Sequence, residues 1–325
     1  MSHLLCLILP VSTLLFLVTG PHGIAGALAW MLPLFGVLLA DRFSPTSKLH
    51  CQTSLPSGFF EGRLYSLAVL QMINIIMMLV LVSQLRWDSF DSVTISVTHL
   101  IVIRFLVATS SCCSGIIVAH ELIHHSHQWQ RRLGRLLLIS VCYDHFVITH
   151  IQSHHYYAGR PQDISTAHLG ESFSDYWRRV VVAQFVFAWR FNKNQVIQGL
   201  LAEFMLIITI VYGFGWVAAM MFIYQAYSAI RILEAVNYIQ HWGLSSEMPD
   251  PAIAWVSDNG FTQQMFMGLP LHICHHKYSS KPFYQLSYCH DGPKMPYGYF
   301  IMNLWVKLDN TSFQRMADRA IKRWK

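Results

Sequence analysis

Long apolar stretches separated by short polar segments dominate the chain. Residues 4–19, 22–40, 64–85, 93–119, 196–212 and 214–236 contain almost no charged side chains. Each stretch is close to the length of about 20 residues that a helix needs to cross a bilayer. The pattern therefore predicts an all-α, multi-pass membrane bundle of about six transmembrane helices, arranged as three hairpins within a single membrane-embedded domain over residues 1–325.

Three further segments favour helices that do not span the membrane. Residues 133–148 are apolar but short, and they include Asp144 and His145. We expect one helix there, buried among others or dipping into the membrane interface. Residues 173–191 and 311–325 mix basic and aromatic positions, which predicts surface helices whose polar faces meet either water or lipid headgroups.

Composition supports a membrane protein, and charge predicts its orientation. Hydrophobic residues make up 54% of the chain and charged residues 12%, about half the charged share of a soluble domain. Eight Lys or Arg lie within residues 119–196 and nine follow residue 236, whereas the opposite turns hold only Arg86. Because cytoplasmic segments carry the excess of Lys and Arg, we expect both termini on the cytoplasmic side. The basic residues form no single run, so nucleic acid is not an expected partner, and membrane lipids are.

Histidine is the unusual residue type. The 18 His outnumber the 17 Asp and Glu, and 14 of the 18 lie between residues 120 and 290. They gather in patches at residues 120–125, 150–155, 237–241 and 272–276. Residues three or four apart share one face of a helix, so each patch with two or more His would point an imidazole pair inward. The adjacent His155 and His276 would then reach a second metal beside the first.

Metal binding explains this pattern better than a polar core does. A buried polar group without a partner costs about 1–3 kcal/mol, and nine such imidazoles would exceed the stability of an ordinary protein. A single zinc ion is satisfied by three or four ligands, so the number of His implies two ions, although imidazole by itself does not select the element. The expected ligands are His120, His124, His150, His154, His155, His241, His272, His275 and His276.

Two alternatives from other functional classes compete with this interpretation. Residues 120–124 match HExxH, the motif of zinc proteases in which Glu121 would be the general base. An intramembrane protease would also need a late ligand such as Asp309, which lies outside the predicted spans, and it would leave the other patches unexplained. A metal transporter would instead place ionisable residues through the bilayer core, yet here the His gather at one end and Glu203 is the main deep acid in the late spans.

At these residues the chain resembles the membrane-bound alkane hydroxylases, within the superfamily of fatty-acid desaturases and membrane hydroxylases. The first box, HELxH, appears at residues 120–124, and the second at residues 150–155, followed by Asp163. The third box appears at residues 233–243. The fourth appears at residues 269–276, with Tyr-Gln-Leu at 284–286 and a PxxPxGY sequence at 293–299 following it. Four boxes in the family's order make a specific signal, which covers about residues 90–300.

The resemblance implies a six-helix membrane body with a His-rich cytoplasmic cap, formed here by residues 120–195 and 237–300. The cap would hold two non-haem irons on the nine His named above. The implied reaction uses O2 to hydroxylate an alkane or the acyl chain of a lipid, with electrons from a rubredoxin or ferredoxin and an NAD(P)H reductase. On the same scaffold, removal of a second hydrogen would make the enzyme a desaturase.

The chain departs from the family pattern at three acids near the site. Thr149, Gln240 and Cys274 stand where the family has carboxylates. Because carboxylates that accept the outer imidazole N–H raise ligand basicity, we expect more electron-poor metals. The candidate catalytic residues are Glu121 and Asn237, where Asn237 would bind a metal-bound water or else tie two helices together. The acids expected to support the ligands are Asp144, Asp163, Glu234 and Asp258.

Overall fold

The computed structural model describes residues 2–48, 55–245 and 254–324. Helices connected by turns and loops make up this part of the chain, and within it the only β-type pairings are two isolated bridges, Thr46 with Asn259 and Val256 with Lys294. The all-α prediction is confirmed.

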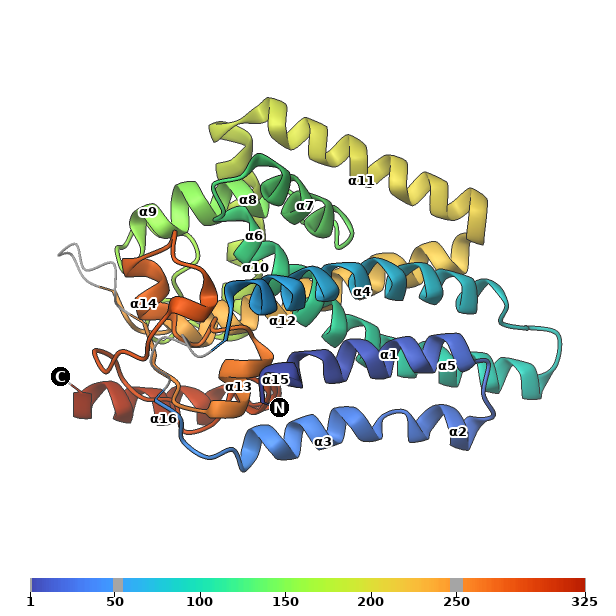
Figure 1. Ribbon diagram of the computed structural model, residues 1–325, viewed down its shortest axis with the longest axis horizontal. Coiled ribbons are helices and arrows are strands. Elements are labelled where there is room, and N and C mark those ends of the chain that lie inside the picture. Colours follow the sequence, from blue (N-terminus) through green and yellow to red (C-terminus); the bar gives the residue numbers. More distant parts are fainter. Residues whose placement is uncertain (1, 49–54, 246–253, 325) are drawn as a thin grey trace.

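Five helical segments are long and apolar enough to cross a membrane: Ile24–Arg42, Ser57–Ser83, Phe90–Ile123, Lys193–Phe214 and Trp216–His241. In Figure 1 these are α2 (Ile24–Ala29) with α3 (Leu32–Arg42), α4 (Ser57–Ser83), α5 (Phe90–Ser110) continuing to α6 (Ile117–Ile123), α11 (Lys193–Phe214) and α12 (Trp216–His241). The stretch predicted at residues 4–19 forms a shorter apolar helix, His3–Thr19, which contains α1 (Ile8–Thr19). The count of six spans therefore stays a prediction.

Local sequence explains where several of these helices begin. The Ser89 side chain accepts a hydrogen bond from the backbone N–H of Ser92, and the Ser92 side chain accepts one from Ser89, a reciprocal cap at the start of α5. The Asn192 side chain caps the first turn of α11 by accepting a hydrogen bond from the backbone N–H of Gln195. Gly215, with φ of 85°, reverses the chain between α11 and α12. These signals define the last hairpin.

The prediction of one helix over residues 133–148 is wrong. The segment contains the end of α7 (Gln128–Ile139) and the start of α8 (Phe146–Thr149), with a turn between them. Cys142 in this turn has a positive φ of 52°, and Arg135 donates to both carboxylate oxygens of Asp144, at 2.9 and 2.7 Å. The ion pair across the turn stabilises a reversal that hydrophobicity alone does not indicate.

The remaining helices gather at the left end of the bundle in Figure 1. They include α9 (His155–Tyr157), α13 (Gly260–Met265), α14 (His272–Lys277) and α15 (Tyr299–Leu308). The two predicted surface helices appear as α10 (Phe173–Phe191) and α16 (Asn310–Trp324), within one residue of the expected bounds. All the predicted metal ligands lie at this end.

A buried acid at the end of α3 holds the first spans to this cap. The Asp41 carboxylate accepts hydrogen bonds from the backbone N–H of Ile301, at 2.9 Å, and from the Thr262 hydroxyl. Gly298 leaves room for that carboxylate, because a Cβ at this position would collide with Asp41 Oδ1. The N-terminal spans thus support the cap, although they carry none of its His patches.

Candidate metal centre

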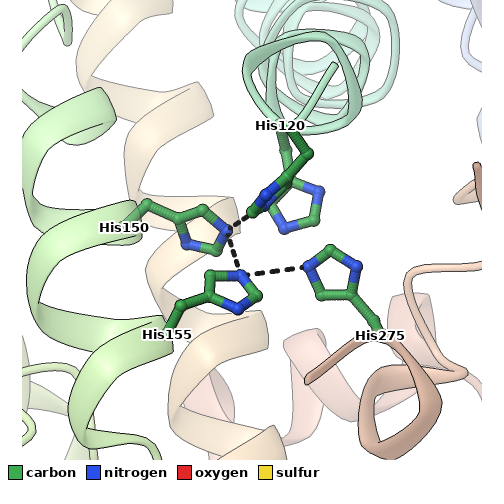
Figure 2. Close-up of side chains that lie close together, drawn as sticks. His120, His150, His155 and His275 are labelled. Atoms are coloured by element: carbon green, nitrogen blue, oxygen red, sulfur yellow. Dashed lines mark hydrogen bonds between the residues drawn. The ribbon is translucent and has the colours of Figure 1, made fainter. Parts of the chain in front are cut away.

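All nine predicted ligands meet inside the cap, supplied by four separate segments. The end of the Phe90–Ile123 helix provides His120 and places His124 directly after it, and α12 ends at His241. The segment His150–His154 with α9 brings three His, and α14 brings three more. Figure 2 shows His120, His150, His155 and His275 pointing toward one common space, with His150 and His155 on the same green ribbon and the other two on separate segments.

The nine imidazoles divide into two compact groups. The five-histidine group contains His120, His124, His150, His155 and His275, and the four-histidine group contains His154, His241, His272 and His276. Within each group the ligand nitrogens all lie within 4.8 Å of one another. The division matches the two ions that the number of His implied.

The pairing within two of the patches differs from the expectation. We expected His150 and His154 to serve one ion and His155 the other, but His150 and His155 share a group and His154 joins the second. The reason is a π-helical turn, in which the N–H of His155 donates to the carbonyl of His150, five residues back. The wider turn brings positions i and i+5 closer to one face than an α-helix does. In α14, His272 is grouped with His276 and apart from His275.

Hydrogen bonding does not account for how the rings of the five-histidine group face one another. Nε2 of His150 lies 3.0 Å from Nε2 of both His124 and His155, and Nε2 of His155 lies 3.2 Å from that of His275. A neutral imidazole nitrogen carries either one proton or one lone pair. The His150 nitrogen therefore makes at most one of its two contacts as an ordinary hydrogen bond.

The four-histidine group repeats this arrangement. Nε2 of His272 lies 2.9 Å from Nε2 of both His241 and His276. Nε2 of His154 is buried without a hydrogen-bond partner among the described residues, as is Nε2 of His120 in the other group. Nitrogens that bind one ion at about 2.1 Å lie about 3 Å apart when the bonds are at right angles. Both groups thus fit a metal ion.

Burial keeps these imidazoles in the form that binds metal. It lowers the pKa of His150, His155, His272, His275 and His276 well below the usual value, and the neighbouring imidazoles lower each pKa further. A neutral ring presents a lone pair to a cation. Metal binding at neutral pH would therefore displace few protons from these side chains.

Asp163 lies where an acid supporting the ligands was expected. Its Oδ2 lies 2.9 Å from Nδ1 of His154, so the acid can fix which nitrogen of that ring faces its group. Asp163 also accepts from the Ser165 N–H at 2.9 Å and from the Thr166 hydroxyl at 2.8 Å. Burial would raise the pKa of Asp163, but the charge and hydrogen bond of His154 together with the other donors hold it below the usual value.

The other three candidate acids bind elsewhere. Asp144 pairs with Arg135, and Asp258 lies 2.5 Å from Nζ of Lys294. Glu234 accepts hydrogen bonds from four side chains, and none of them is a predicted ligand: Tyr143, Tyr176, Gln184 and Asn237. Spacing along the sequence could not separate these acids from Asp163.

The two candidate catalytic residues differ in where they lie. Glu121 is buried beside the five-histidine group, where it lines a void of about 10 Å³ together with His120 and His275. It accepts from the backbone N–H of Phe283 at 3.0 Å. Asn237 instead donates to Glu234 on its own helix, at 3.2 Å. Glu121 thus borders the same void as two predicted ligands, while the hydrogen bond of Asn237 runs along its own helix.

The neutral residues at the family's acidic positions also have other partners. Gln240 donates to the Tyr299 hydroxyl at 2.8 Å, and the Thr149 hydroxyl donates to the carbonyl of Phe146 at 3.1 Å. Cys274 Sγ accepts from the N–H of Ser287 at 3.4 Å.

Asp309, the late acid that a protease would use, accepts from the N–H of Ser312 and so caps α16.

Sequence reasoning missed a buried polar network next to the ligands. Tyr143 and Tyr176 donate to the two oxygens of Glu234, at 2.7 and 3.0 Å, and the Tyr176 hydroxyl also lies 3.0 Å from the carbonyl of Ser165. Gln184 donates to Glu234 at 3.2 Å. The network connects α12 to the loop that carries Asp163. Glu234 belongs to the third box, but its partners Tyr143, Tyr176 and Gln184 are scattered through the sequence, and no motif points to them.

Comparison with known proteins places the site in a family context. The sequence profile of the family described as "Fatty acid desaturase" matches residues 96–304. Alkane 1-monooxygenase 1 of Pseudomonas aeruginosa is 31% identical over 207 residues, covering 57% of this chain and 54% of that protein. Alkane 1-monooxygenase of Acinetobacter baylyi is 29% identical over 239 residues, covering 65% of this chain and 58% of that protein.

A more distant relative acts on aromatic compounds according to its name. The xylene/toluene monooxygenase hydroxylase component of Pseudomonas putida is 24% identical over 224 residues, covering 64% of this chain and 60% of that protein. The chain thus spans a little more than half the length of the curated relatives it matches.

Proposed function

Because this chain belongs to the fatty acid desaturase family, we propose that it is a membrane di-iron monooxygenase that hydroxylates an unactivated C–H bond of an alkyl chain. The observation that carries the proposal is the division of nine His into two groups in which one nitrogen faces two others, so that hydrogen bonds cannot account for all the contacts. The similar curated proteins are named as monooxygenases, which favours hydroxylation over desaturation.

The residues that would hold the metals are the five-histidine and the four-histidine groups, with one ion in each. When bound, the irons would activate O2, so that one oxygen atom enters the C–H bond while two electrons and two protons reduce the other to water. The electrons would come from a rubredoxin or ferredoxin with an NAD(P)H reductase. The excess of basic residues on the two His-bearing segments supports a cap and termini on the cytoplasmic side.

The side chains of the protein would position and insulate this reaction. Asp163 orients His154, and Glu121 lies beside the five-histidine group at the small void next to His275. The apolar residues that line this void, among them Ile117 and Leu269, would exclude water and face the alkyl chain.

Metal analysis of the purified protein tests the proposal first. Detergent-purified protein expressed with ⁵⁷Fe should contain about two irons per chain, and Mössbauer spectra should show that they are coupled. His150→Ala should remove about one of them, whereas His127→Ala, an exposed His on the same side of the bundle, should remove none. One zinc per chain without iron would contradict the proposal.

Product analysis provides the second test. With ¹⁸O2 and a reduced ferredoxin, dodecane should yield an alcohol that carries the label. An alkene as the main product would favour the desaturase alternative.

A further inference from the structure

A cavity of about 360 Å³ lies among the long helices, outside the His groups. Its walls come from α3, α5, α12 and α15, together with Phe266 and Tyr299 from the cap. Several residues at its rim are exposed on the surface of the bundle, including Phe105, Tyr227 and Leu304. The cavity therefore opens to the side, where lipid chains would surround the spans.

Three basic residues line this cavity, and no acid lines it. Arg104 lies on α5, Arg231 on α12 and Lys307 on α15. Within residues 2–48, 55–245 and 254–324, no carboxylate lies within ion-pair distance of any of the three. Three positive charges thus face one small volume without a counter-charge.

The contacts of these cations with uncharged side chains leave one buried donor without a partner among the described residues. Arg231 donates from Nη1 to the Tyr227 hydroxyl at 3.0 Å, and its Nε is buried with no hydrogen-bond partner among the described residues. The Arg104 guanidinium lies over the Tyr224 ring, at 5.4 Å. Burial lowers the pKa of Lys307 to about 8, and the charge of Arg231 acts in the same direction. An anion in the cavity would relieve this mutual repulsion.

The position of the cations makes a structural role a poor explanation. Arg104 and Arg231 lie inside the spans Phe90–Ile123 and Trp216–His241. Charged side chains within membrane spans are costly and are usually kept for a ligand or a pathway. Neither a helix end nor an ion pair in the described residues accounts for Arg104 and Arg231, whereas Lys307 lies in the last turn of α15.

One aromatic side chain borders both this cavity and the metal centre. Phe266 lines the large cavity and also the void beside His120, Glu121 and His275. Its ring packs against Tyr299 and Phe300, with centroids 5.5 and 4.9 Å away. Met267, the next residue, has a positive φ of 44°, a conformation that costs energy for a residue with a side chain and is often found at functional sites. Movement of Phe266 would join the two spaces.

We propose that the large cavity binds a single-chain fatty acid by its carboxylate, with the chain running past Phe266 to the five-histidine group. The three cations would recognise the head group, and Phe266 would admit the far end of the chain. This inference rests on the proposed function and names its substrate class. The enzyme would then hydroxylate a fatty acid at a carbon remote from the carboxylate. One atom of O2 would enter the C–H bond, and two electrons and two protons would reduce the other atom to water.

The distances along the helices set the expected chain length. Ten residues separate Arg231 from His241, and sixteen separate Arg104 from His120, which correspond to about 15 and 24 Å of helix. An extended alkyl chain advances about 1.25 Å per carbon, given a bond of 1.52 Å and a near-tetrahedral angle. His241 belongs to the four-histidine group and His120 to the five-histidine group, so chains of about 12 to 19 carbons would reach from the cations to the metal centre as a whole.

The size of the cavity favours a fatty acid over an acidic phospholipid. Its volume is near the lower end of the range of about 300–1,000 Å³ found for small-molecule pockets. A phospholipid would bring a second acyl chain and a larger head group into the same space. A fatty acid has a single acyl chain and a carboxylate that can pair with the cations, and it does not bring the additional volume of a phospholipid.

Equilibrium binding tests the proposal without any turnover. The full chain, loaded with iron and placed in phosphatidylcholine nanodiscs, is titrated with radiolabelled dodecanoate and with dodecan-1-ol. We expect dodecanoate to bind at least about tenfold more tightly, because it gains charge-assisted hydrogen bonds. Arg231→Gln and Lys307→Gln should each weaken dodecanoate binding by about tenfold and leave dodecan-1-ol binding unchanged.

Matched variants separate lost recognition from misfolding. Lys307→Arg keeps the charge and should retain the binding of dodecanoate, while Arg315→Gln, on the exposed face of α16, should change nothing. Equal binding of the acid and the alcohol, or unchanged binding in both charge-removing variants, would overturn the proposal. Displacement of dodecanoate by phosphatidylglycerol included in the nanodiscs would show that an acidic phospholipid is the occupant.

Failure of this inference is distinguishable from failure of the proposed function. If dodecane is hydroxylated but dodecanoate neither binds nor reacts, only the assignment of the head group is wrong. If dodecanoate binds through the cations but no iron is present and nothing is oxidised, the cavity assignment holds and the oxygenase proposal fails.

Discussion

Oδ2 of Asp163 lies 2.9 Å from Nδ1 of His154, and both side chains are almost completely buried. Two further donors, the Ser165 N–H and the Thr166 hydroxyl, hold the carboxylate in place. The acid therefore determines how the His154 ring faces the other three His of its group.

Replacing this acid should weaken metal binding without removing a ligand. Asp163→Asn keeps an oxygen that accepts a hydrogen bond but loses the charge that makes the imidazole more basic. Loss of such a supporting partner typically reduces metal affinity by about 10- to 100-fold. We expect iron to be lost more readily to a chelator, measured by competition at constant pH. Asp318→Asn, on the surface of α16 and paired with Lys322, serves as the control, and equal iron retention in both variants would contradict this role.

Phe266 should control how far a substrate chain reaches. Phe266→Ala would join the cavity among the helices to the void beside Glu121. We expect the variant to oxidise chains with bulky or branched ends that the parent enzyme rejects, measured as product ratios in mixed-substrate assays. Loss of a buried Phe also costs about 3–5 kcal/mol, so the thermal midpoint should fall. Phe191→Ala, at an exposed position, should change neither the product ratio nor the thermal midpoint. An unaltered product ratio for Phe266→Ala would contradict the role of Phe266 in limiting substrate entry.

The buried network around Glu234 should contribute to stability. Tyr143→Phe removes the hydroxyl that donates to Glu234 at 2.7 Å and leaves that carboxylate with one donor fewer. The expected loss is about 1–2 kcal/mol in the free energy of unfolding, detected as a lower thermal midpoint in detergent. Tyr212→Phe is the matched control because Tyr212 is 89% exposed. A similar midpoint for both variants would show that the network is dispensable.

Two glycines on α11 should respond in opposite ways to the same change. A Cβ at Gly199 would lie 2.9 Å from the Cβ of Asp144, whereas a Cβ at Gly213 would meet nothing within 4 Å. Gly199→Ala should destabilise the protein by about 1–3 kcal/mol, because it pushes α11 away from the Arg135–Asp144 pair. Gly213→Ala should be neutral or slightly stabilising, since it removes backbone freedom from a helix. Comparison of the two unfolding midpoints checks the packing of α11, and a stable Gly199→Ala variant would disprove it.

Hydrophobic patterning along the chain indicated the membrane body with little ambiguity. A stretch of about 20 apolar residues has few structural options in a bilayer, because its backbone groups must bond internally. The span predicted at residues 196–212 accordingly lies within α11, Lys193–Phe214, and the span predicted at 214–236 lies within α12, Trp216–His241, except for its first two residues. The short segment at residues 133–148 was misjudged because a turn stabilised by one ion pair leaves no periodic signal.

Spacing also identified the nine His, since regular helices bring positions such as His120 and His124 to one face. How the nine divide depended on the π-helical turn at His150–His154, a local widening that sequence periodicity does not reveal. Tertiary structure likewise decided that Asp163 meets a ligand while Asp144 and Asp258 pair with cations. Only the tertiary structure shows that Arg104, Arg231 and Lys307 line one cavity. Contacts within one helix follow from its period, whereas contacts between helices depend on packing that only the folded chain defines.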